Sequence, residues 1–403
     1  MTSAAGLSRA RLQTIDRFLE ARYVGPGRLP CAQMLIARGG ELAHQAVLGL
    51  ADVERGRPLQ EDALFRIYSM TKPLTTVAFV MLAEEGRVAV DDPVEKFIPE
   101  WRDLGVFVAG QPGGWVTRRP DRPMQVVDLL RHTSGLTYGF QTRTNVDRAY
   151  RKAGIGEMGG KLSLEAMIGA LAKVPLEFSP GEAWNYSVST DVLGYLIQAI
   201  TGRPFQDVLR ERVIEPLGMV DTAFHVPAEK AARLTACYNF APPAGLTLQD
   251  DPQTSAYLAP PAFYSGGGGL VSTAADYLKF CQMLLNGGKA NGVRFLSRKT
   301  LAFMTLNHLP GGRDLNELSR SMFSEAAYAG VGFGLGFAVT TDLARNLIAG
   351  SRGEFYWGGA ASTAFWVDPA EDLTVVFMTQ VLPSASYPIR RELRTLVYAS
   401  IDD

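Results

Sequence analysis

The stretch SMTKPLTTVAFVMLAEEG, residues 69–86, decides how the rest of the chain is interpreted. Its apolar residues recur at helical spacing and Gly86 is a typical helix stop, so we expect a helix that starts at Ser69. Ser69 and Lys72 would then lie one turn apart on the same face of that helix. Ser69 is the only serine of the chain that has a lysine three residues later.

This pair of side chains suits nucleophilic catalysis. A serine hydroxyl becomes a good nucleophile only when a neighbouring base takes its proton. Lysine can act as that base where burial lowers its pKa, because an apolar environment disfavours the ammonium ion. Serine is also a common helix N-cap, so the pair alone fits either a nucleophile with its base or an ordinary helix start.

A second candidate lies in WNYSVSTDVLGYL, residues 184–196, where Tyr186 precedes a predicted helix. A tyrosine can relay protons if a nearby cation stabilises its phenolate. The competing interpretation is a core aromatic residue whose hydroxyl is hydrogen-bonded, as is usual for buried tyrosines. The local sequence leaves both interpretations open.

A third candidate is EFYWGGAAST, residues 354–363, where two glycines interrupt a strand pattern. Glycines inside a strand indicate a bulge or a close approach of another group to the backbone. An edge strand that offers the backbone N–H of Ala360 to a ligand would fit this pattern. A tight turn between two strands would fit it equally well.

Taken together and in this order, the three motifs resemble the signature of serine hydrolases of the penicillin-binding-protein and β-lactamase fold. The sequence is most similar to the family VIII carboxylesterases. The resemblance is carried from about residue 35 to about residue 397 by FRIYSMTKP, LLRHTSGL, FSPGEAWNYS, EPLGM, GFGLGF and WGG. It implies an α/β (α+β) fold of the β-lactamase/transpeptidase type, with an antiparallel sheet flanked by helices and a mostly helical domain.

The resemblance also implies roles for individual residues. Ser69 would be the acylated nucleophile and Lys72 its general base. Tyr186 would relay the proton to and from the leaving group. The backbone N–H groups of Ser69 and Ala360 would form the oxyanion hole. The implied reaction is hydrolysis of carboxylic esters through an acyl-Ser69 intermediate, with no cofactor and no metal.

Two departures from class C β-lactamases bear on the substrate. Those enzymes have Tyr-Ala-Asn where this chain has Tyr186, Ser187 and Val188, so an amide that would contact a β-lactam side chain is missing. Their Lys-Thr-Gly strand motif is replaced here by a tryptophan and two glycines. A site without that cation is expected to prefer short or apolar, neutral acyl groups, which favours an esterase over a β-lactamase or peptidase.

We expect the substrate site to be formed by aromatic and glycine residues close to these motifs. The residues concerned are Trp357, Gly358, Gly359, Tyr138, Phe140 and Tyr264. Trp184 could also line an acyl or alcohol pocket, although packing in the core is the ordinary role of such a side chain. RHTSGL, residues 131–136, carries a histidine and a serine, but we interpret it as a structural turn after a helix.

Hydrophobic periodicity predicts how the chain is organised. Residues 32–49 read as two strands joined at Gly39 and Gly40. The pattern is mainly helical from residue 69 to about 260 and returns to short strands in the last quarter. We therefore expect one antiparallel sheet built from both ends of the chain. Residues 1–68 and about 265–403 would form a discontinuous α/β domain, and about 69–264 a mostly helical domain with the active site at the interface.

Composition limits the classes of partner. Of the 403 residues, 47% are hydrophobic, and 40 Lys and Arg balance 41 Asp and Glu, giving a formal net charge of −1. This balance argues against nucleic acid or an acidic membrane surface as the main partner. Three widely separated cysteines indicate a reduced compartment. We expect a cytoplasmic protein that acts on a small-molecule ester without a membrane span; the oligomeric state is open.

Other hydrolase and cofactor classes lack their motifs here. No serine has glycine two residues before and two residues after it, as an α/β-hydrolase nucleophile requires. The histidines are scattered without metal-ligand spacing, and GFGLGF is not the dinucleotide-binding pattern. The alternatives that remain are acyl transfer to an acceptor other than water, β-lactamase or D-amino peptidase activity, and a catalytically idle member of the fold that binds a ligand.

Overall fold

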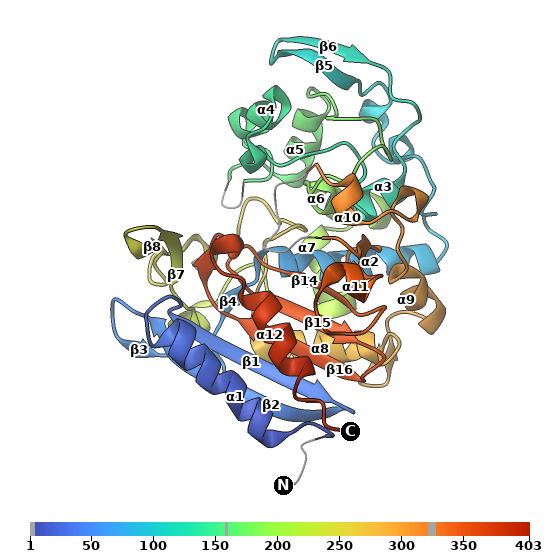
Figure 1. The fold of residues 1–403 in the computed structure, drawn as a ribbon. Helices are drawn as coiled ribbons and strands as arrows, with labels where there is room; N and C mark the ends of the chain where they lie inside the picture. The colour runs from blue at the N-terminus through green and yellow to red at the C-terminus, as the bar shows by residue number, and fades with distance from the viewer. Residues whose placement is uncertain (1–4, 158–159, 321–327) are drawn as a thin grey trace.

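The computed structural model describes residues 5–157, 160–320 and 328–403 (Figure 1). Its largest sheet has eight strands in the order β12-β13-β14-β15-β16-β1-β2-β3, with every neighbouring pair antiparallel. The strands are β1 (Cys31–Arg38), β2 (Glu41–Asp52), β3 (Arg57–Pro58), β12 (Val331–Phe333), β13 (Ala338–Thr340), β14 (Phe355–Gly358), β15 (Ala364–Asp368) and β16 (Leu373–Met378). Leu35 of β1 lies opposite Val376 of β16. The sheet is therefore assembled from both ends of the chain, as predicted.

The β1–β2 hairpin forms where the sequence predicts it. Gly39 and Gly40 have φ angles of +59° and +78°, in the left-handed region that glycine adopts without a steric penalty. Strand pleating then sends alternate residues of β1 to opposite faces of the sheet. Met34 and Ile36 enter one apolar core and Leu35 and Ala37 enter the other. Each such buried side chain contributes roughly 1.5–3 kcal/mol, so both faces of the sheet must be covered.

Helices cover both faces. The helices α1 (Arg9–Leu19) and α12 (Ile389–Tyr398) pack on one face, and Figure 1 shows them side by side on the viewer's side of the sheet. The helix α8 (Ala274–Leu285) packs on the other face, against β1, β15 and β16. The helix α2 (Thr71–Glu84) runs beyond it and is buried almost along its whole length. The fold class is the one predicted.

Eight further α-helices complete the fold of the described residues. They are α3 (Val126–Leu130), α4 (Asn145–Ala153), α5 (Leu164–Leu171), α6 (Ser189–Thr201), α7 (Phe205–Leu209), α9 (Arg298–Met304), α10 (Leu315–Leu318) and α11 (Leu343–Asn346). Figure 1 shows α4 and α5 at the end of the molecule away from the sheet. None of the helices among the described residues is long and apolar enough to cross a membrane.

The stretch predicted to be mainly helical also contains two hairpins that the prediction missed. They are β5 (Val106–Gln111) with β6 (Gly114–Arg118), and β7 (Cys237–Ala241) with β8 (Gly245–Asp250). β7 also pairs in parallel with β17 (Val381–Leu382), close to the C-terminal strands. The smaller pairs are β4 (Phe65–Arg66) with β9 (Val271–Ser272), and β10 (Lys289–Ala290) with β11 (Val293–Arg294). Short exposed strands carry little apolar periodicity, which is why the sequence pattern does not reveal them.

Candidate active site

Ser69 lies at the entrance of α2, but not in it. It occupies a 3₁₀ turn, Tyr68–Met70, and the α-helix begins two residues later at Thr71. Tyr68 has a φ of +42°, which is unfavourable for a bulky side chain. The turn is braced by β4 and β9, with the Ile67 N–H donating to the carbonyl of Leu270 at 3.1 Å. Ser69 therefore lies at the N-terminal end of the predicted helix.

Lys72 is the centre of the hydrogen-bond network. Its Nζ lies 3.3 Å from Ser69 Oγ, 3.1 Å from the hydroxyl of Tyr138 and 2.6 Å from the carbonyl oxygen of Gly267. The side chain is only 2% exposed. Burial lowers the pKa of Lys72 to about 7, and the nearby carboxylate of Asp191 opposes part of that shift. A substantial fraction of Lys72 is therefore an uncharged amine at neutral pH.

The three contacts decide what the uncharged amine does. A neutral amine has two N–H donors and one lone pair, and a backbone carbonyl such as that of Gly267 can only accept. With the second N–H directed to the hydroxyl of Tyr138, the lone pair is left for the proton of Ser69. Tyr138, expected only as a wall of the pocket, thus also contacts the candidate base.

Asp191 fixes the loop that supplies this carbonyl. It lies on α6 and is 1% exposed. Its Oδ1 accepts from Ser265 Oγ at 2.5 Å and from the Gly267 N–H at 2.9 Å. Burial raises the pKa of the Asp191 carboxyl, while the charge of Lys72 lowers it. Sequence reasoning missed Asp191, Ser265 and Gly267, because only the run of glycines at 266–269 was a local signal and nothing in it points to Lys72.

Tyr186 lies next to the same lysine. Its side chain is 2% exposed, and Lys72 Nζ is 4.4 Å from the centroid of its ring. Burial raises the pKa of Tyr186, whereas its hydrogen bonds with Ser69 and Trp357 act in the opposite direction. The phenol is therefore protonated at neutral pH and can donate a proton. The structure brings Ser69, Lys72 and Tyr186 together, although they lie far apart in sequence.

Trp357 is mostly buried and is not among the residues that line the cavity containing Ser69. It lies on β14, is 8% exposed, and packs its ring against Phe333 at a centroid distance of 5.4 Å. Its indole N–H donates to the hydroxyl of Tyr186 at 3.3 Å. Where related enzymes have a cation, this chain therefore places a neutral hydrogen-bond donor on the tyrosine.

Three other predicted pocket residues also serve packing. Tyr264 stacks edge-on against Phe224 at 5.2 Å and is not part of the cavity wall. A Cβ at Gly358 would lie 2.5 Å from the guanidinium carbon of Arg390, and one at Gly359 would lie 2.5 Å from the Ile67 carbonyl oxygen. These glycines therefore allow the strand to approach its neighbours closely. Trp184 is fully buried and likewise lies in the core.

A cavity of about 890 Å³ opens in front of Ser69. Of the predicted residues, its wall contains Ser69, Tyr138, Phe140, Tyr186 and Ala360. Phe140 is 54% exposed and its ring stacks on Tyr138 at a centroid distance of 4.7 Å. The rest of the wall combines the aromatic and aliphatic side chains of Tyr68, Ile155, Tyr257, Leu382 and Pro383 with the polar or charged side chains of Arg151, Glu157, Asn239, Gln249 and Asp250. The volume is that of a pocket for a drug-sized molecule.

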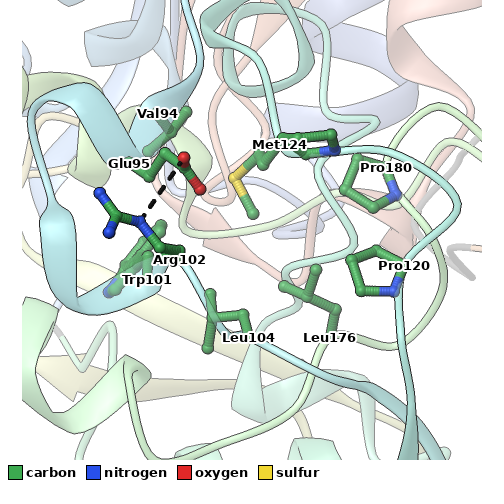
Figure 2. A pocket seen from close by; sticks show the side chains of 10 residues that line it. Val94, Glu95, Trp101, Arg102, Leu104, Pro120, Met124, Leu176 and Pro180 are labelled. Carbon is green, nitrogen blue, oxygen red and sulfur yellow. Dashed lines mark ion pairs between the residues drawn. The ribbon is translucent and has the colours of Figure 1, made fainter.

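A second cavity lies among the helices away from this site (Figure 2). It measures about 20 Å³ and is lined by apolar and proline side chains together with the ion pair between Arg102 and Glu95. Such a space holds about one water molecule. It contains none of the candidate catalytic residues, so the larger cavity is the candidate active site.

The sequence is similar to those of known proteins over most of its length. Residues 15–399 match the family described as Beta-lactamase. The chain belongs to the β-lactamase family. Within it, Protein Rv1367c of Mycobacterium tuberculosis is 35% identical, over 89% of this chain and 88% of its own. Esterase EstB of Burkholderia gladioli is 32% identical, over 98% of this chain and 96% of its own.

A solved structure of this β-lactamase-like fold extends the comparison. EstCE1, described as a hydrolase with promiscuous acyltransferase activity, superposes with a TM-score of 0.79. It is 26% identical, and 98% of each chain is covered. These similarities confirm the predicted fold and the resemblance to the esterase branch of the β-lactamase family. In the described residues of this family member, no group of three or more His, Cys, Asp or Glu side chains could hold a metal ion.

Proposed function

We propose that the protein is a serine carboxylesterase that works through an acyl-Ser69 intermediate. The observation that carries the proposal is the environment of Lys72. Its buried Nζ lies 3.3 Å from Ser69 Oγ while Gly267 and Tyr138 occupy its other hydrogen-bonding positions. The 32% identity to Esterase EstB over nearly the whole chain supports the same reaction.

Acylation follows from this arrangement. The uncharged amine of Lys72 takes the proton of Ser69 as Oγ attacks the ester carbonyl carbon. The backbone N–H groups of Ser69 and Ala360, at the edge of the cavity, would stabilise the oxyanion. When the carbon–oxygen bond to the alcohol breaks, the hydroxyl of Tyr186 donates a proton to the leaving oxygen. The ammonium of Lys72 returns the proton to Tyr186, which leaves the amine uncharged.

Deacylation reverses the same transfers. A water molecule enters in place of the alcohol and attacks the acyl carbonyl carbon, giving its proton to Tyr186 while Tyr186 passes its own proton to the uncharged amine of Lys72. The ammonium of Lys72 then holds the proton that Ser69 needs. Ser69 recovers its proton as the acid leaves. The same step with an alcohol in place of water would transfer the acyl group, and the size of the cavity leaves room for such an acceptor. Acyl transfer is therefore the second candidate function, and EstCE1 is described as having both activities.

The cavity supports neutral, apolar acyl or alcohol groups as the substrate class. Aromatic and aliphatic side chains such as Tyr68, Phe140, Ile155 and Leu382 form much of its wall. At the strand position where class C β-lactamases have a lysine, Trp357 is turned toward Tyr186 and supplies no cation. A carboxylate on the substrate therefore lacks the partner that those enzymes offer, which disfavours β-lactams.

The test is hydrolysis of p-nitrophenyl esters from acetate to octanoate beside a chromogenic cephalosporin, with Ser69→Ala as the control. We expect ester cleavage that depends on Ser69, slow or absent cephalosporin cleavage, and labelling of Ser69 by a serine-directed phosphonate. An unlabelled, inactive wild-type protein would contradict the proposal. Adding a primary alcohol and measuring the new ester separates hydrolysis from acyl transfer.

We also propose that the chain forms two domains and that the protein is located in the cytoplasm. The division into an α/β domain and a mostly helical domain is supported by the sheet built from both chain ends, although β7 and β17 connect the two ranges. A cytoplasmic location is supported by Cys31, Cys237 and Cys281, which are all buried and unpaired. Limited proteolysis and fractionation of the producing cells would test them.

A further inference from the structure

The RHTSGL turn, residues 131–136, contacts the ring of Tyr186 through His132. His132 is 2% exposed, and its ring centroid lies 5.0 Å from that of Tyr186. It also has a φ of +58°, unusual for a residue other than glycine. Such a backbone geometry is maintained only where the surrounding structure requires it.

A chain of hydroxyl groups extends from this histidine. His132 Nδ1 lies 3.2 Å from Ser187 Oγ, which lies 2.8 Å from Ser189 Oγ. Ser189 Oγ lies in turn 2.8 Å from Ser134 Oγ. All three serines are fully buried. The chain therefore links the turn that contains His132 and Ser134 to the turn that carries Tyr186.

One direction of donation gives every hydroxyl proton in the chain an acceptor. Ser134 donates to Ser189, Ser189 to Ser187, and Ser187 to Nδ1 of His132. If Nδ1 donated instead, the proton of Ser134 would have no acceptor among the hydrogen bonds of the described residues. The histidine must then be uncharged, with its proton on Nε2. Burial and the charge of Lys72 do hold the pKa of His132 well below its ordinary value.

Backbone hydrogen bonds fix the same two turns to each other. The Asn185 N–H donates to the carbonyl of His132 at 2.9 Å, and the Val188 N–H donates to the carbonyl of Thr137 at 3.2 Å. These bonds hold the main chain on both sides of Tyr186. They do not act on its ring, which packs against His132 at a centroid distance of 5.0 Å and also against Tyr138, Trp184 and Trp357.

We propose that His132 is a positioning residue for Tyr186: its uncharged imidazole, held by the Ser187–Ser189–Ser134 hydroxyl chain, fixes the direction in which the phenol donates its proton. The inference rests on the proposed function, in which Tyr186 protonates the leaving alcohol. It assigns no bond-making step to His132. Displacing the histidine removes one of the rings that hold the Tyr186 side chain, which alters the direction of the phenol and weakens only the steps that need its proton.

Leaving groups of different basicity separate this role from a merely structural one. An alkoxide must be protonated as it leaves, whereas p-nitrophenolate leaves without a proton. The experiment compares kcat/KM for the ethyl and p-nitrophenyl esters of the same acid. For His132→Leu we expect about a 30-fold fall with the ethyl ester and less than about 3-fold with the p-nitrophenyl ester. Ser187→Ala, which breaks the chain at its first link and leaves the histidine in place, should show the same selectivity.

Two control variants accompany this experiment: one replaces His132 conservatively, and the other replaces a histidine far from the site. In His132→Asn the amide oxygen can accept from Ser187 at the position of Nδ1, so most of the ethyl-ester activity should return. His44→Leu, which removes a histidine bonded to Asp16 at the sheet, should leave both esters unchanged. Equal losses with both esters in His132→Leu and Ser187→Ala, or no loss in either, would overturn the inference.

The same assay separates failure of the inference from failure of the proposed function. Tyr186→Phe should show the strongest selectivity against the ethyl ester. If it shows none, the acid role of Tyr186 is refuted and the inference falls with it. If Tyr186→Phe is selective while His132→Leu and Ser187→Ala are not, the proposed function stands and only the inference is refuted.

Discussion

The indole N–H of Trp357 donates to the phenol oxygen of Tyr186 at 3.3 Å. The ring of Tyr186 also contacts the rings of His132, Tyr138 and Trp184. A neutral donor at this position stabilises a developing phenolate less than an ammonium would. It leaves Tyr186 protonated, while burial makes Lys72 the group that can accept a proton at neutral pH. The roles of base and acid thus follow from burial, which lowers the pKa of the Lys72 amine and raises that of the Tyr186 phenol.

Replacing Trp357 by Phe removes that donor but keeps an aromatic ring against Phe333. The hydroxyl of Tyr186 then loses one partner, and we expect kcat/KM for an ethyl ester to fall about 5- to 10-fold, the effect of one hydrogen bond. Steady-state kinetics measure it, with Phe140→Leu as a comparison at the pocket wall. A rise in cephalosporin cleavage in Trp357→Phe would contradict the view that the missing cation, and not the bulk of the indole, excludes β-lactams.

Ser69→Ala should abolish turnover, by about 10³-fold or more, because no other side chain can form the acyl intermediate. The change is small and lies in a partly exposed turn, so the melting temperature should stay within a few degrees of the wild type. Mass spectrometry after brief mixing with a slow ester should find the acyl adduct on wild-type protein alone. An adduct of the same mass on Ser69→Ala would rule out the assigned nucleophile.

The pH dependence of kcat/KM should follow the protonation of Lys72. Below a pH of about 7 the ammonium donates to Ser69, Tyr138 and Gly267 and has no lone pair left for the serine proton. Therefore kcat/KM should rise as the pH increases through about 7 and then level off. A pH–rate profile with a non-ionising ester checks this. A profile that falls across the same range would assign the base to another group.

Lys72→Met should make the protein inactive but more stable near neutral pH. Folding moves the pKa of Lys72 from 10.5 to about 7, so between these values the unfolded chain holds a proton that the folded chain has released. The free energy of unfolding of the wild type therefore rises with pH through this window. The free-energy cost of burying Lys72 is greatest at or below pH 7. We expect Lys72→Met to unfold with about 2 kcal/mol more free energy near pH 7, with the difference shrinking toward pH 10.

Urea denaturation of both proteins across that pH range measures the difference. Lys96→Met, at an exposed lysine whose partner is Asp92, is the matched control and should show no such pH dependence. A stability difference that grows as the pH is raised would show that burial does not depress the pKa of Lys72.

Asp191→Asn should move the acid limb of the pH–rate profile to lower pH. The negative charge of Asp191 opposes the burial that lowers the pKa of Lys72, so removing the charge lets that pKa fall further. The amide can still accept from Gly267 or Ser265, which limits the disturbance of the loop. An acid limb that moves to higher pH would mean that the loop, rather than the charge, dominates the environment of Lys72.

Much of the fold could be predicted from periodicity and turn residues. The hairpin at Gly39–Gly40 and the helix α8 are local features, because a turn or an amphipathic face is encoded within a few residues. The pairing of Leu35 with Val376 is not local, yet strands at both chain ends with helices between them already favour one shared sheet. The β5–β6 and β7–β8 hairpins were missed because short, exposed strands have little apolar pattern.

For the active site, the sequence by itself pointed to Ser69, Lys72 and Tyr186, because the Ser-x-x-Lys spacing and the order of the motifs along the chain are local features. Only the tertiary structure decided how Lys72 is surrounded. Tyr138, Asp191 and the carbonyl of Gly267 reach it from separate segments, and their contact depends on packing, which no local spacing encodes. The same packing placed the indole N–H of Trp357 on the hydroxyl of Tyr186, because a buried indole N–H needs a hydrogen-bond acceptor.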